Sequence, residues 1–498
     1  MKNFLTNTLV TTLTVLVCVV LAEAGMRIAD GLPATSMVLP ESIGTLGVDT
    51  TANHLEAVPR APGIELKLFG ENPPPLPNRR APPAEEMELF RRVQREALIG
   101  VAQGLNPFQP WDIFKAWNAE FVGDPCKHRY LKAAPGLIYA YDPLDGGDRP
   151  RFRFLPDTTL PSGLVTNQFG WRGPPVEFKR APRTVRIVFI GASAMAEIHH
   201  YPHATPEYIH HWLNLWAAAR KLDVRFEAMN AARESIGSTD IAAIIRQEVA
   251  PVRPDLVVYY EGGNQFDMGT VVKDVPKGVP RPAGLLAGWL RDLAPYSAIA
   301  RRAEALVGGS EWPKPAYKLE LAVGLDENAP DVARKDLPLN LPTIIADLDR
   351  IRADLAKVDG EFAIASFHWL VKDGLELDAV RHKTILQSLN VNHFPYTYRD
   401  LERMTAFQNR VFGKYAAVHG LPFIDVAKHM PYDPDLFSDP VHNTPAGVKL
   451  RAWIMLQQLV PVIEARLGSG AWPKPPPEMG TTHPAFTRPP RRITFTCK

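Results

Sequence analysis

The part of the sequence that most constrains the fold is an alternation of apolar runs and amphipathic segments between about residues 184 and 467. The apolar runs are continuous, as in strands buried on both faces, and segments with helical periodicity lie between them. Predicted strands are 185–190, 225–230, 256–260, 361–367 and 423–426, and predicted helices are 205–221, 241–249, 343–358, 401–419 and one that begins at 445. This strict alternation predicts an α/β fold in which helices cover both faces of a mostly parallel sheet.

Proline is in excess, because 48 of the 498 residues are proline, roughly twice the usual share. Much of the excess lies outside the alternating region, which suggests five parts. These are an N-terminal apolar segment (1–24), a Pro-rich spacer with a short helix after Pro83 (25–135), a lead-in segment that packs on the core (136–184), the α/β domain with an insertion at about 267–340 (185–467), and a Pro/Arg-rich tail (468–498). Hydrophobic residues make up 46% of the chain, enough for a large core, and the net charge of +2 gives no reason to expect nucleic acid as a partner.

The N-terminal segment is long enough to cross a lipid bilayer. From Asn3 to Ala22 there are twenty residues without a charge. Lys2 precedes this run and Glu23 follows it, which favours export of the rest of the chain. Two interpretations stay open: an uncleaved membrane anchor, or a signal peptide cleaved near Ala22-Glu23-Ala24, which would release the protein. Both place the body in the periplasm or outside the cell.

Three cysteines fit an exported protein. Cys18 lies in the apolar segment, so Cys126 and Cys497 are the one pair left for a disulfide in an oxidising compartment. The alternative is two free thiols.

Unusual residues follow the predicted strands, where parallel α/β sheets carry their sites. Ser193 ends the turn Gly191-Ala192-Ser193, and Asn264 stands in Gly262-Gly263-Asn264-Gln265. Asp439 and His442 are three residues apart just before the last helix, a spacing that lets a carboxylate orient an imidazole. Taken singly, each motif also fits a bland structural role: a helix cap for Ser193, a Gly-Asn turn for Asn264, and capping residues for Asp439 and His442.

Taken together and in this order, the motifs resemble those of the SGNH (GDSL-type) hydrolases, over about residues 160–467. The resemblance rests on 187–193, on Asn230-Ala231-Ala232-Arg233-Glu234-Ser235, on Gly262-Gly263-Asn264, on Asp439-Pro440-Val441-His442, and on the lead-in Asn167-Gln168-Phe169-Gly170-Trp171-Arg172-Gly173. It implies a flavodoxin-like sheet and a Ser-His-Asp triad. Three positions depart from the family pattern: Ala192 for Asp, Ser235 for Gly, and Gln265 for an acidic residue.

The resemblance also implies a role for each matching residue. Ser193 would be the nucleophile, His442 its general base and Asp439 the residue that orients the base. The backbone N–H groups of Ser193 and Ser235 and the side chain of Asn264 would form an oxyanion hole.

Several other residues are candidates for contact with the substrate. Gly263 and His368 follow predicted strands, and His199 comes soon after Ser193. The remaining histidines of this region, such as His203 and His210, have no carboxylate or cysteine at ligand spacing, so we predict no metal and no cofactor.

The sequence therefore predicts a membrane-anchored, exported serine esterase. Its substrate would be an O-acyl ester, such as an O-acetyl group, on a small molecule or on a cell-envelope or exported polysaccharide. Two alternatives stay open: an O-acyltransferase that acts on a glycan, and an inactive glycan-binding or scaffold subunit of an envelope complex. The sequence leaves the acyl chain and the oligomeric state open.

Overall fold

The computed structural model describes residues 2–30, 32, 34–37, 39, 49–82, 84, 87–88, 137–140, 149–150, 153–154, 156–159, 164–197, 203–271, 285–308, 319–378, 381–487 and 491–494. The helix predicted after Pro83 falls largely outside these residues. Cys126, Cys497 and His199 also lie outside them.

The centre of the molecule is a parallel sheet of five strands in the order β3-β2-β4-β5-β6. Its strands are β2 (Thr184–Gly191), β3 (Arg225–Asn230), β4 (Leu256–Tyr260), β5 (Glu361–Ala365) and β6 (Phe423–Ile424). In the register of the sheet, Val188 of β2 lies between Met229 of β3 and Val257 of β4. All eight residues of β2, among them the charged Arg186, and all five of β4 are buried, as the mainly apolar sequences of these strands predict.

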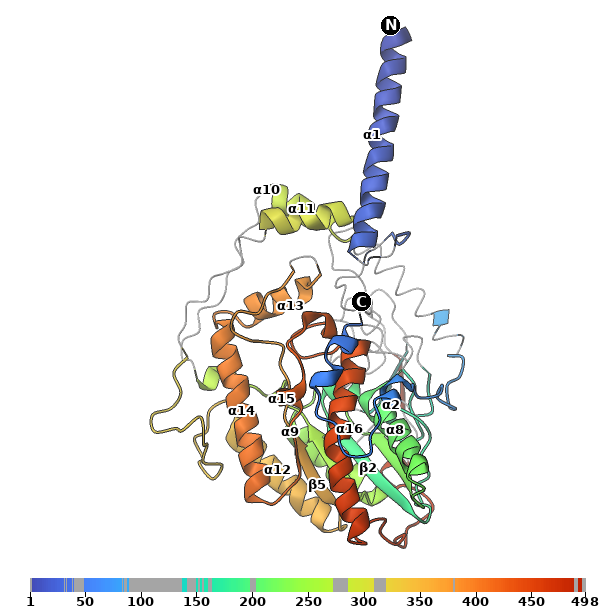
Figure 1. Cartoon of the computed structure of the whole chain (residues 1–498), viewed down its shortest axis with the longest axis vertical. Coiled ribbons are helices and arrows are strands. Elements are labelled where there is room, and N and C mark those ends of the chain that lie inside the picture. The colour runs from blue at the N-terminus through green and yellow to red at the C-terminus, as the bar shows by residue number, and fades with distance from the viewer. Residues whose placement is uncertain are drawn as a thin grey trace.

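Helices cover both faces of this sheet, so the predicted three-layer α/β fold is confirmed (Figure 1). The helices of the body are α2 (Lys67–Gly70), α7 (Ser193–Ala196), α8 (Thr205–Ala219), α9 (Ser238–Ile244), α12 (Leu341–Ala356), α13 (Lys383–Gln387), α14 (Tyr398–Val418), α15 (Val426–His429) and α16 (Pro445–Gly468). Helices α8 and α16 pack together, and α12 packs on α9. The predicted helix 241–249 begins earlier, at Ser238, and its last five residues form a π-helical turn.

Residues 49–82 correct the prediction of a spacer, because this segment packs against the α/β body. Phe69 lies between two tryptophans, with ring centroids 5.6 Å from Trp453 of α16 and 6.1 Å from Trp212 of α8. The indole N–H of Trp212 donates to the carbonyl of Glu71 at 2.8 Å. The apolar residues of this segment are scattered among prolines without a helical or strand period, so no local pattern indicates a buried face.

We expect Phe69→Ala to lower the free energy of unfolding by about 3 kcal/mol, because it opens a cavity between two buried indoles. Leu66→Ala is the matched control in the same segment. Leu66 is 38% exposed, and we expect a loss below about 1 kcal/mol. Denaturant unfolding of both variants checks this, and equal small losses would mean that the segment is a loosely held spacer.

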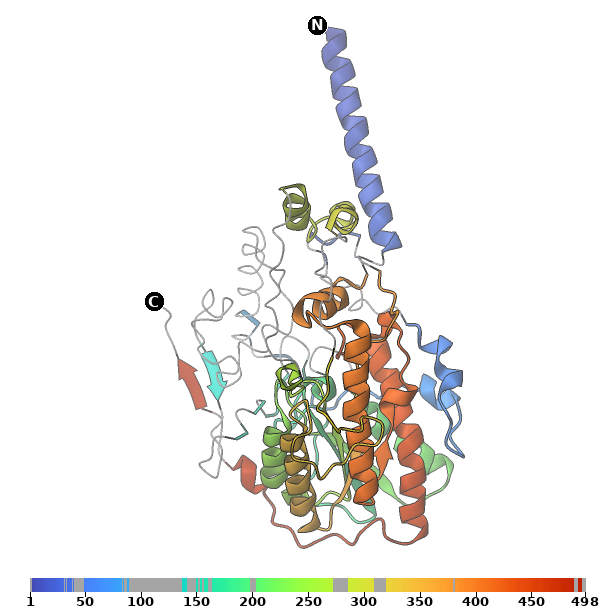
Figure 2. The same cartoon turned by 90° about the vertical axis from the view of Figure 1, so that its left-hand side faces the viewer.

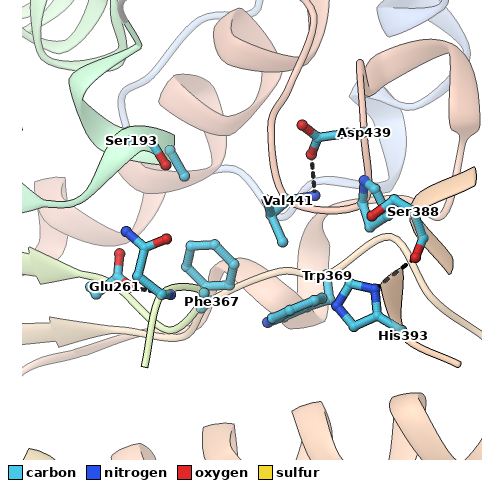
Figure 3. Close-up of a pocket in the computed structure, with 12 residues that line it drawn as sticks. Ser193, Glu261, Phe367, Trp369, Ser388, His393, Asp439 and Val441 are labelled. Atoms are coloured by element: carbon cyan, nitrogen blue, oxygen red, sulfur yellow. Dashed lines mark hydrogen bonds between the residues drawn. The ribbon is translucent and has the colours of Figure 1, made fainter. Parts of the chain in front are cut away.

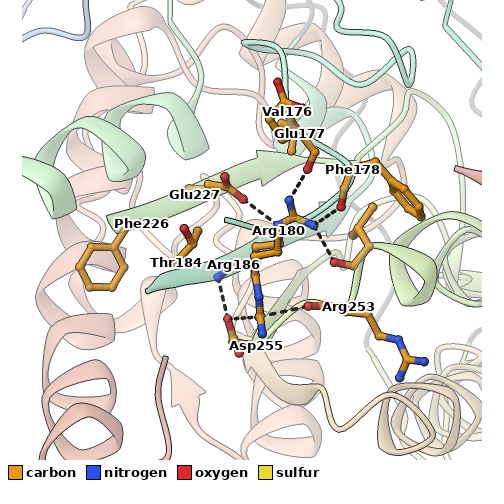
Figure 4. Close-up of polar contacts among 12 residues, drawn as sticks. Val176, Glu177, Phe178, Arg180, Thr184, Arg186, Phe226, Glu227, Arg253 and Asp255 are labelled. Atoms are coloured by element: carbon orange, nitrogen blue, oxygen red, sulfur yellow. Dashed lines mark hydrogen bonds and ion pairs between the residues drawn. The ribbon is translucent and has the colours of Figure 1, made fainter. Parts of the chain in front are cut away.

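The lead-in segment and the C-terminal tail meet at the amino end of the central strands. Asp255 accepts hydrogen bonds from the side chain of Arg180 and from the backbone N–H of Arg186, both at 2.8 Å (Figure 4). Arg180 also donates to the carbonyls of Lys474 and Pro475, both at 3.1 Å. Buried charges are stable only when they are paired in this way, so this cluster fixes both segments to the sheet.

A small second sheet lies outside the body. Strand β1 (Leu137–Ala140) pairs antiparallel with β7 (Arg491–Thr494), which brings the end of the chain beside the lead-in segment. A bridge between Cys126 and Cys497 stays a prediction.

An apolar helix, α1 (Lys2–Ala29), projects from one end of the body (Figures 1 and 2). Its stretch Thr6–Ala29 is apolar and long enough to cross a membrane, and residues 6–22 of it are exposed throughout. The helix is compatible with an anchor or with a signal sequence. It runs past the predicted boundary at residue 24 to meet a pair of helices, α10 (Leu285–Leu293) and α11 (Ala298–Gly308), that belong to the predicted insertion.

Candidate active site

Ser193 is held in a tight turn at the carboxyl end of β2. The strand ends at Gly191, where a Cβ would come within 2.1 Å of the carbonyl oxygen of Tyr260, so only glycine fits between the two strands. Ser193 is the first residue of the short helix α7 and is 9% exposed. Its backbone N–H belongs to the first turn of that helix and has no acceptor within it.

His442 and Asp439 meet Ser193 from the other end of the chain, 249 residues away. The Nε2 atom of His442 lies 2.7 Å from the Ser193 Oγ, and its Nδ1 atom lies 2.6 Å from Asp439 Oδ2. The other carboxylate oxygen of Asp439 accepts the backbone N–H groups of Val441 and His442, at 2.8 and 2.9 Å. In the neutral imidazole the carboxylate therefore holds the proton on Nδ1, which leaves Nε2 as the acceptor for the serine hydroxyl.

A buried arginine ties the serine turn to the histidine loop. Arg451 lies two turns into α16 and donates to the carbonyl of Ala194 and to the side chain of Asn443, both at 2.7 Å. It also forms an ion pair with Glu197, and both side chains are 1% exposed. Glu197 in turn accepts the N–H of Thr205 at 2.6 Å. One guanidinium thus links the residues next to Ser193 with the residue next to His442.

Asn264 and Ser235 lie on the loops that follow the neighbouring strands. One N–H of the Asn264 amide donates to the carbonyl of Ile236 at 3.0 Å, and the amide carries a second N–H. Ser235 has φ of 54°, the left-handed region that favours glycine. This explains why the family that the sequence resembles has glycine there. The backbone of this chain takes the same turn at a cost of about 1 kcal/mol.

Glu261 is a buried carboxyl group that sequence reasoning missed. It is 1% exposed, and its two oxygens accept the backbone N–H groups of Ala192 at 3.2 Å and Asn264 at 2.8 Å. It therefore joins the serine turn to the Asn264 loop. Burial raises the pKa of Glu261 to about 7, against the opposing effect of its backbone hydrogen bonds. Its place directly before Gly262-Gly263 at the end of a strand was a signal that the sequence offered.

Carboxylates control the charge of His442. Burial alone would lower the pKa of His442, but the charge and hydrogen bond of Asp439, with weaker contributions from Glu234 and Glu261, raise it to about 9. Burial likewise opposes ionisation of Asp439, but His442 and two backbone N–H groups outweigh it and lower the pKa of Asp439 to about 2. The pair therefore favours an imidazolium beside a carboxylate.

The raised pKa of His442 sets an expected pH dependence. Only a neutral imidazole accepts a proton, so a reaction in which His442 is the base for Ser193 should become faster as the pH rises toward about 9 and then level off. Glu261→Gln removes one negative charge, and we expect the rising limb to move to lower pH. A kcat/KM profile from pH 5 to 10 (a range of about five units around these pKa values) measures both. A limb centred at or below the ordinary histidine value, or one that Glu261→Gln leaves in place, would contradict this account.

A cavity of about 190 Å³ opens beside Ser193. Its lining combines the polar side chains of Ser193, Glu261 and Asn264 with the apolar ones of Phe367, Trp369 and Val441, and it includes Gly263, Ser388, His393 and Asp439 (Figure 3). Gly263, predicted as a substrate contact, therefore lies on its wall.

The prediction for His368 is wrong, and the cavity wall contains a different histidine. His368 is 2% exposed and its ring packs against Tyr432 and Phe437, away from the cavity lining. His393 lines the cavity instead, and its Nδ1 lies 2.9 Å from the carbonyl oxygen of Ser388. Side chains alternate along an extended chain, so Phe367 and Trp369 face the cavity while His368 between them faces the core. No sequence signal pointed to His393, which comes from an irregular segment after α13.

In the part of the chain that the structure describes, no group of three or more His, Cys, Asp or Glu side chains is placed to hold a metal ion. His203 packs against Tyr208, and His210 Nδ1 accepts the N–H of Ala228 at 3.3 Å.

No protein-family model and no curated protein matches this chain. Solved structures resemble it at low identity. A lipase/acylhydrolase from Enterococcus faecalis is 14% identical, with 55% of this chain and 95% of that chain covered and a TM-score of 0.30. An acetylxylan esterase from Geobacillus stearothermophilus is 14% identical, with coverage of 55% and 94% and a TM-score of 0.30. A GDSL-like lipase from Bacteroides thetaiotaomicron is 12% identical, with coverage of 57% and 92% and a TM-score of 0.28. At these scores the likeness assigns no activity to this chain.

Proposed function

We propose that the protein is a serine esterase that hydrolyses O-acyl esters through an acyl-enzyme. One observation carries this proposal: His442 lies within hydrogen-bond reach of both Ser193 and Asp439, at 2.7 and 2.6 Å. A helix cap or a turn needs only residues that are close in sequence. It does not require that a serine, an imidazole and a carboxylate from two distant parts of the chain form one hydrogen-bonded series. Nucleophilic catalysis does require them.

Each side chain has a defined part in the reaction. Ser193 Oγ attacks the ester carbonyl carbon while its proton passes to His442 Nε2, and Asp439 stabilises the imidazolium that forms. The tetrahedral oxyanion receives hydrogen bonds from the N–H groups of Ser193 and Ser235 and from Asn264. The leaving alcohol takes the proton from His442. A water molecule then gives a proton to His442 and attacks the acyl-enzyme. The bond between the acyl carbon and Ser193 Oγ breaks, the acid leaves, and His442 returns the proton to Ser193 Oγ.

The size of the cavity favours a short acyl group. At about 190 Å³ it is smaller than the roughly 300–1,000 Å³ of pockets that hold drug-sized ligands, and aromatic rings close it at Phe367 and Trp369. An acetyl group fits this space, and a long acyl chain does not. We propose an O-acetylated saccharide of the cell envelope as the substrate, because α1 as an anchor would hold the exported site near that layer.

A series of p-nitrophenyl esters tests the proposal. We expect the full chain in detergent to hydrolyse acetate and butyrate at least about tenfold faster, in kcat/KM, than octanoate, because the cavity excludes the longer chain. Ser193→Ala is the blank for each ester. Turnover no greater than that of Ser193→Ala would overturn the esterase proposal. Equal rates for all chain lengths would overturn the short-acyl preference alone.

A further inference from the structure

Helix α10 presents a row of apolar side chains to solvent. Leu285 is 98% exposed, Leu286 60% and Trp289 63%. At about 100° per residue these three and Leu293 fall within one arc of about 100°. Ala287, on the opposite side of the helix, is 3% exposed. The helix is therefore amphipathic, and the side that faces away from the protein is the apolar one.

The pair α10–α11 is fixed to the end of α1. The carboxylate of Glu23 in α1 accepts the hydroxyl of Ser297 at 2.8 Å and the N–H groups of Ala298 and Ile299 at 2.7 and 3.1 Å. It thus caps the start of α11, where a negative charge also complements the helix dipole. Arg27 donates to the carbonyl of Tyr296 at 2.7 Å. The position of α10–α11 along the axis of α1 is set by these bonds.

That position coincides with the expected surface of a bilayer. The twenty uncharged residues that end at Ala22 rise about 30 Å as a helix, which matches the hydrocarbon thickness. Glu23, the first charge after them, belongs at the level of the headgroups. Figure 1 shows α11 lying crosswise beside the lower end of α1, and Figure 2 shows it nearly end-on, so α11 lies along a membrane plane when α1 spans it, with α10 packed on α11.

We infer that α10–α11 is a second membrane contact that lies in the interface between lipid and water. This inference rests on the proposed placement of α1 across the bilayer. An amphipathic helix with Trp and Leu on one face buries that face among the acyl chains near the headgroups. The occupant of the apolar face is therefore lipid, because α11 holds α10 near the level at which the exposed apolar part of α1 ends.

Two contacts with the membrane fix the orientation of the α/β body relative to the membrane plane. A single spanning helix leaves the body free to tilt. Helix α16, whose first residue comes three positions after His442, begins at the end of the body from which α1 projects and ends at the opposite end (Figures 1 and 2). The carboxyl edge of the sheet, with Ser193, therefore faces the membrane. Its substrates are those present at or near the membrane surface.

Site-specific fluorescence in vesicles tests the inference on the full chain. Cys18, Cys126 and Cys497 are replaced by serine, and single cysteines labelled with the fluorophore NBD are placed by Leu286→Cys, Leu13→Cys and Val323→Cys. Leu13 lies within α1, and Val323, which is 97% exposed, belongs to the body. The vesicles are phosphatidylcholine and phosphatidylglycerol, with a doxyl quencher either near the headgroup or deep in the acyl chain. Iodide reports exposure to water.

We expect the shallow doxyl lipid to quench the label of Leu286→Cys about twofold and to leave that of Val323→Cys unchanged, while iodide does the reverse. Iodide access at Leu286→Cys equal to that at Val323→Cys would overturn the inference. So would protection from iodide without quenching by either doxyl lipid, because a second copy of the chain would then cover the face. Leu13→Cys separates the two proposals. If the deep quencher reaches Leu13→Cys but no lipid quencher reaches Leu286→Cys, only the interfacial contact fails. If no lipid quencher reaches Leu13→Cys, the placement of α1 fails and the inference fails with it.

Discussion

His442→Ala is expected to lower kcat/KM for p-nitrophenyl acetate by roughly 10⁴-fold, the size of loss that follows removal of one member of a Ser-His-Asp unit. Without the imidazole, nothing at the 2.7 Å position accepts the proton of Ser193, and the neutral hydroxyl is a weak nucleophile. Steady-state hydrolysis at pH 9 measures the loss, because the wild-type base is most active near that pH.

Two comparisons make this result specific. His419→Ala removes the histidine that follows α14 and precedes β6. It lies toward the amino end of the strands, whereas Ser193 lies at their carboxyl end, so we expect less than about a twofold change in kcat/KM. Ser193→Ala combined with His442→Ala should be no slower than either alone, since residues that act as one unit are not additive. Retention of a tenth of wild-type activity by His442→Ala would contradict the assigned role of His442.

Arg451→Met should produce the largest loss of stability, about 3–5 kcal/mol in the free energy of unfolding. Methionine fills a similar volume, but it leaves Glu197 buried at 1% exposure without its countercharge. The carbonyl of Ala194 and the amide oxygen of Asn443 lose their donor at the same time. Denaturant unfolding in detergent measures the loss.

The control for Arg451→Met is Arg183→Met. Arg183 pairs with Asp223 at 2.8 Å, but both side chains are mostly exposed, so we expect a loss within about 0.5 kcal/mol. The activity that remains in folded Arg451→Met should also fall, because the serine turn and the histidine loop are no longer linked. A loss below about 1 kcal/mol for Arg451→Met would show that the guanidinium is not what holds the two loops together.

The sheet was predictable from local sequence because its strands are buried on both faces. A run such as that of β4 (Leu256–Tyr260) has no polar residue on either face, so it can be recognised in the sequence as a buried strand. The order of strands and helices then predicted Ser193 and Asn264 at one edge of the sheet, and the resemblance to a family added His442. Each of these residues belongs to a short motif of neighbouring residues, so the sequence alone was enough to predict which side chains the structure brings together.

The remaining features depend on contacts between distant segments, which no local pattern encodes. Phe69 is buried because Trp212 and Trp453 come together from α8 and α16. His393 reaches the cavity from an irregular segment, and His368 is turned into the core by the alternation of side chains. The exposed apolar side chains of α10 indicate a membrane contact only because a hydrogen bond from the backbone N–H of Ala298 to Glu23 fixes α11 to α1.

Covalent labelling tests the central claim most directly. The full chain in detergent at pH 9 is treated with a fluorophosphonate, which forms a stable phosphoryl bond to an activated serine oxygen, and the adduct is located by peptide mass spectrometry. The account predicts one adduct, on Ser193, that His442→Ala abolishes, because His442 lies 2.7 Å from the Ser193 Oγ and removes its proton. No adduct in the wild type, or an adduct on a different serine, would contradict it.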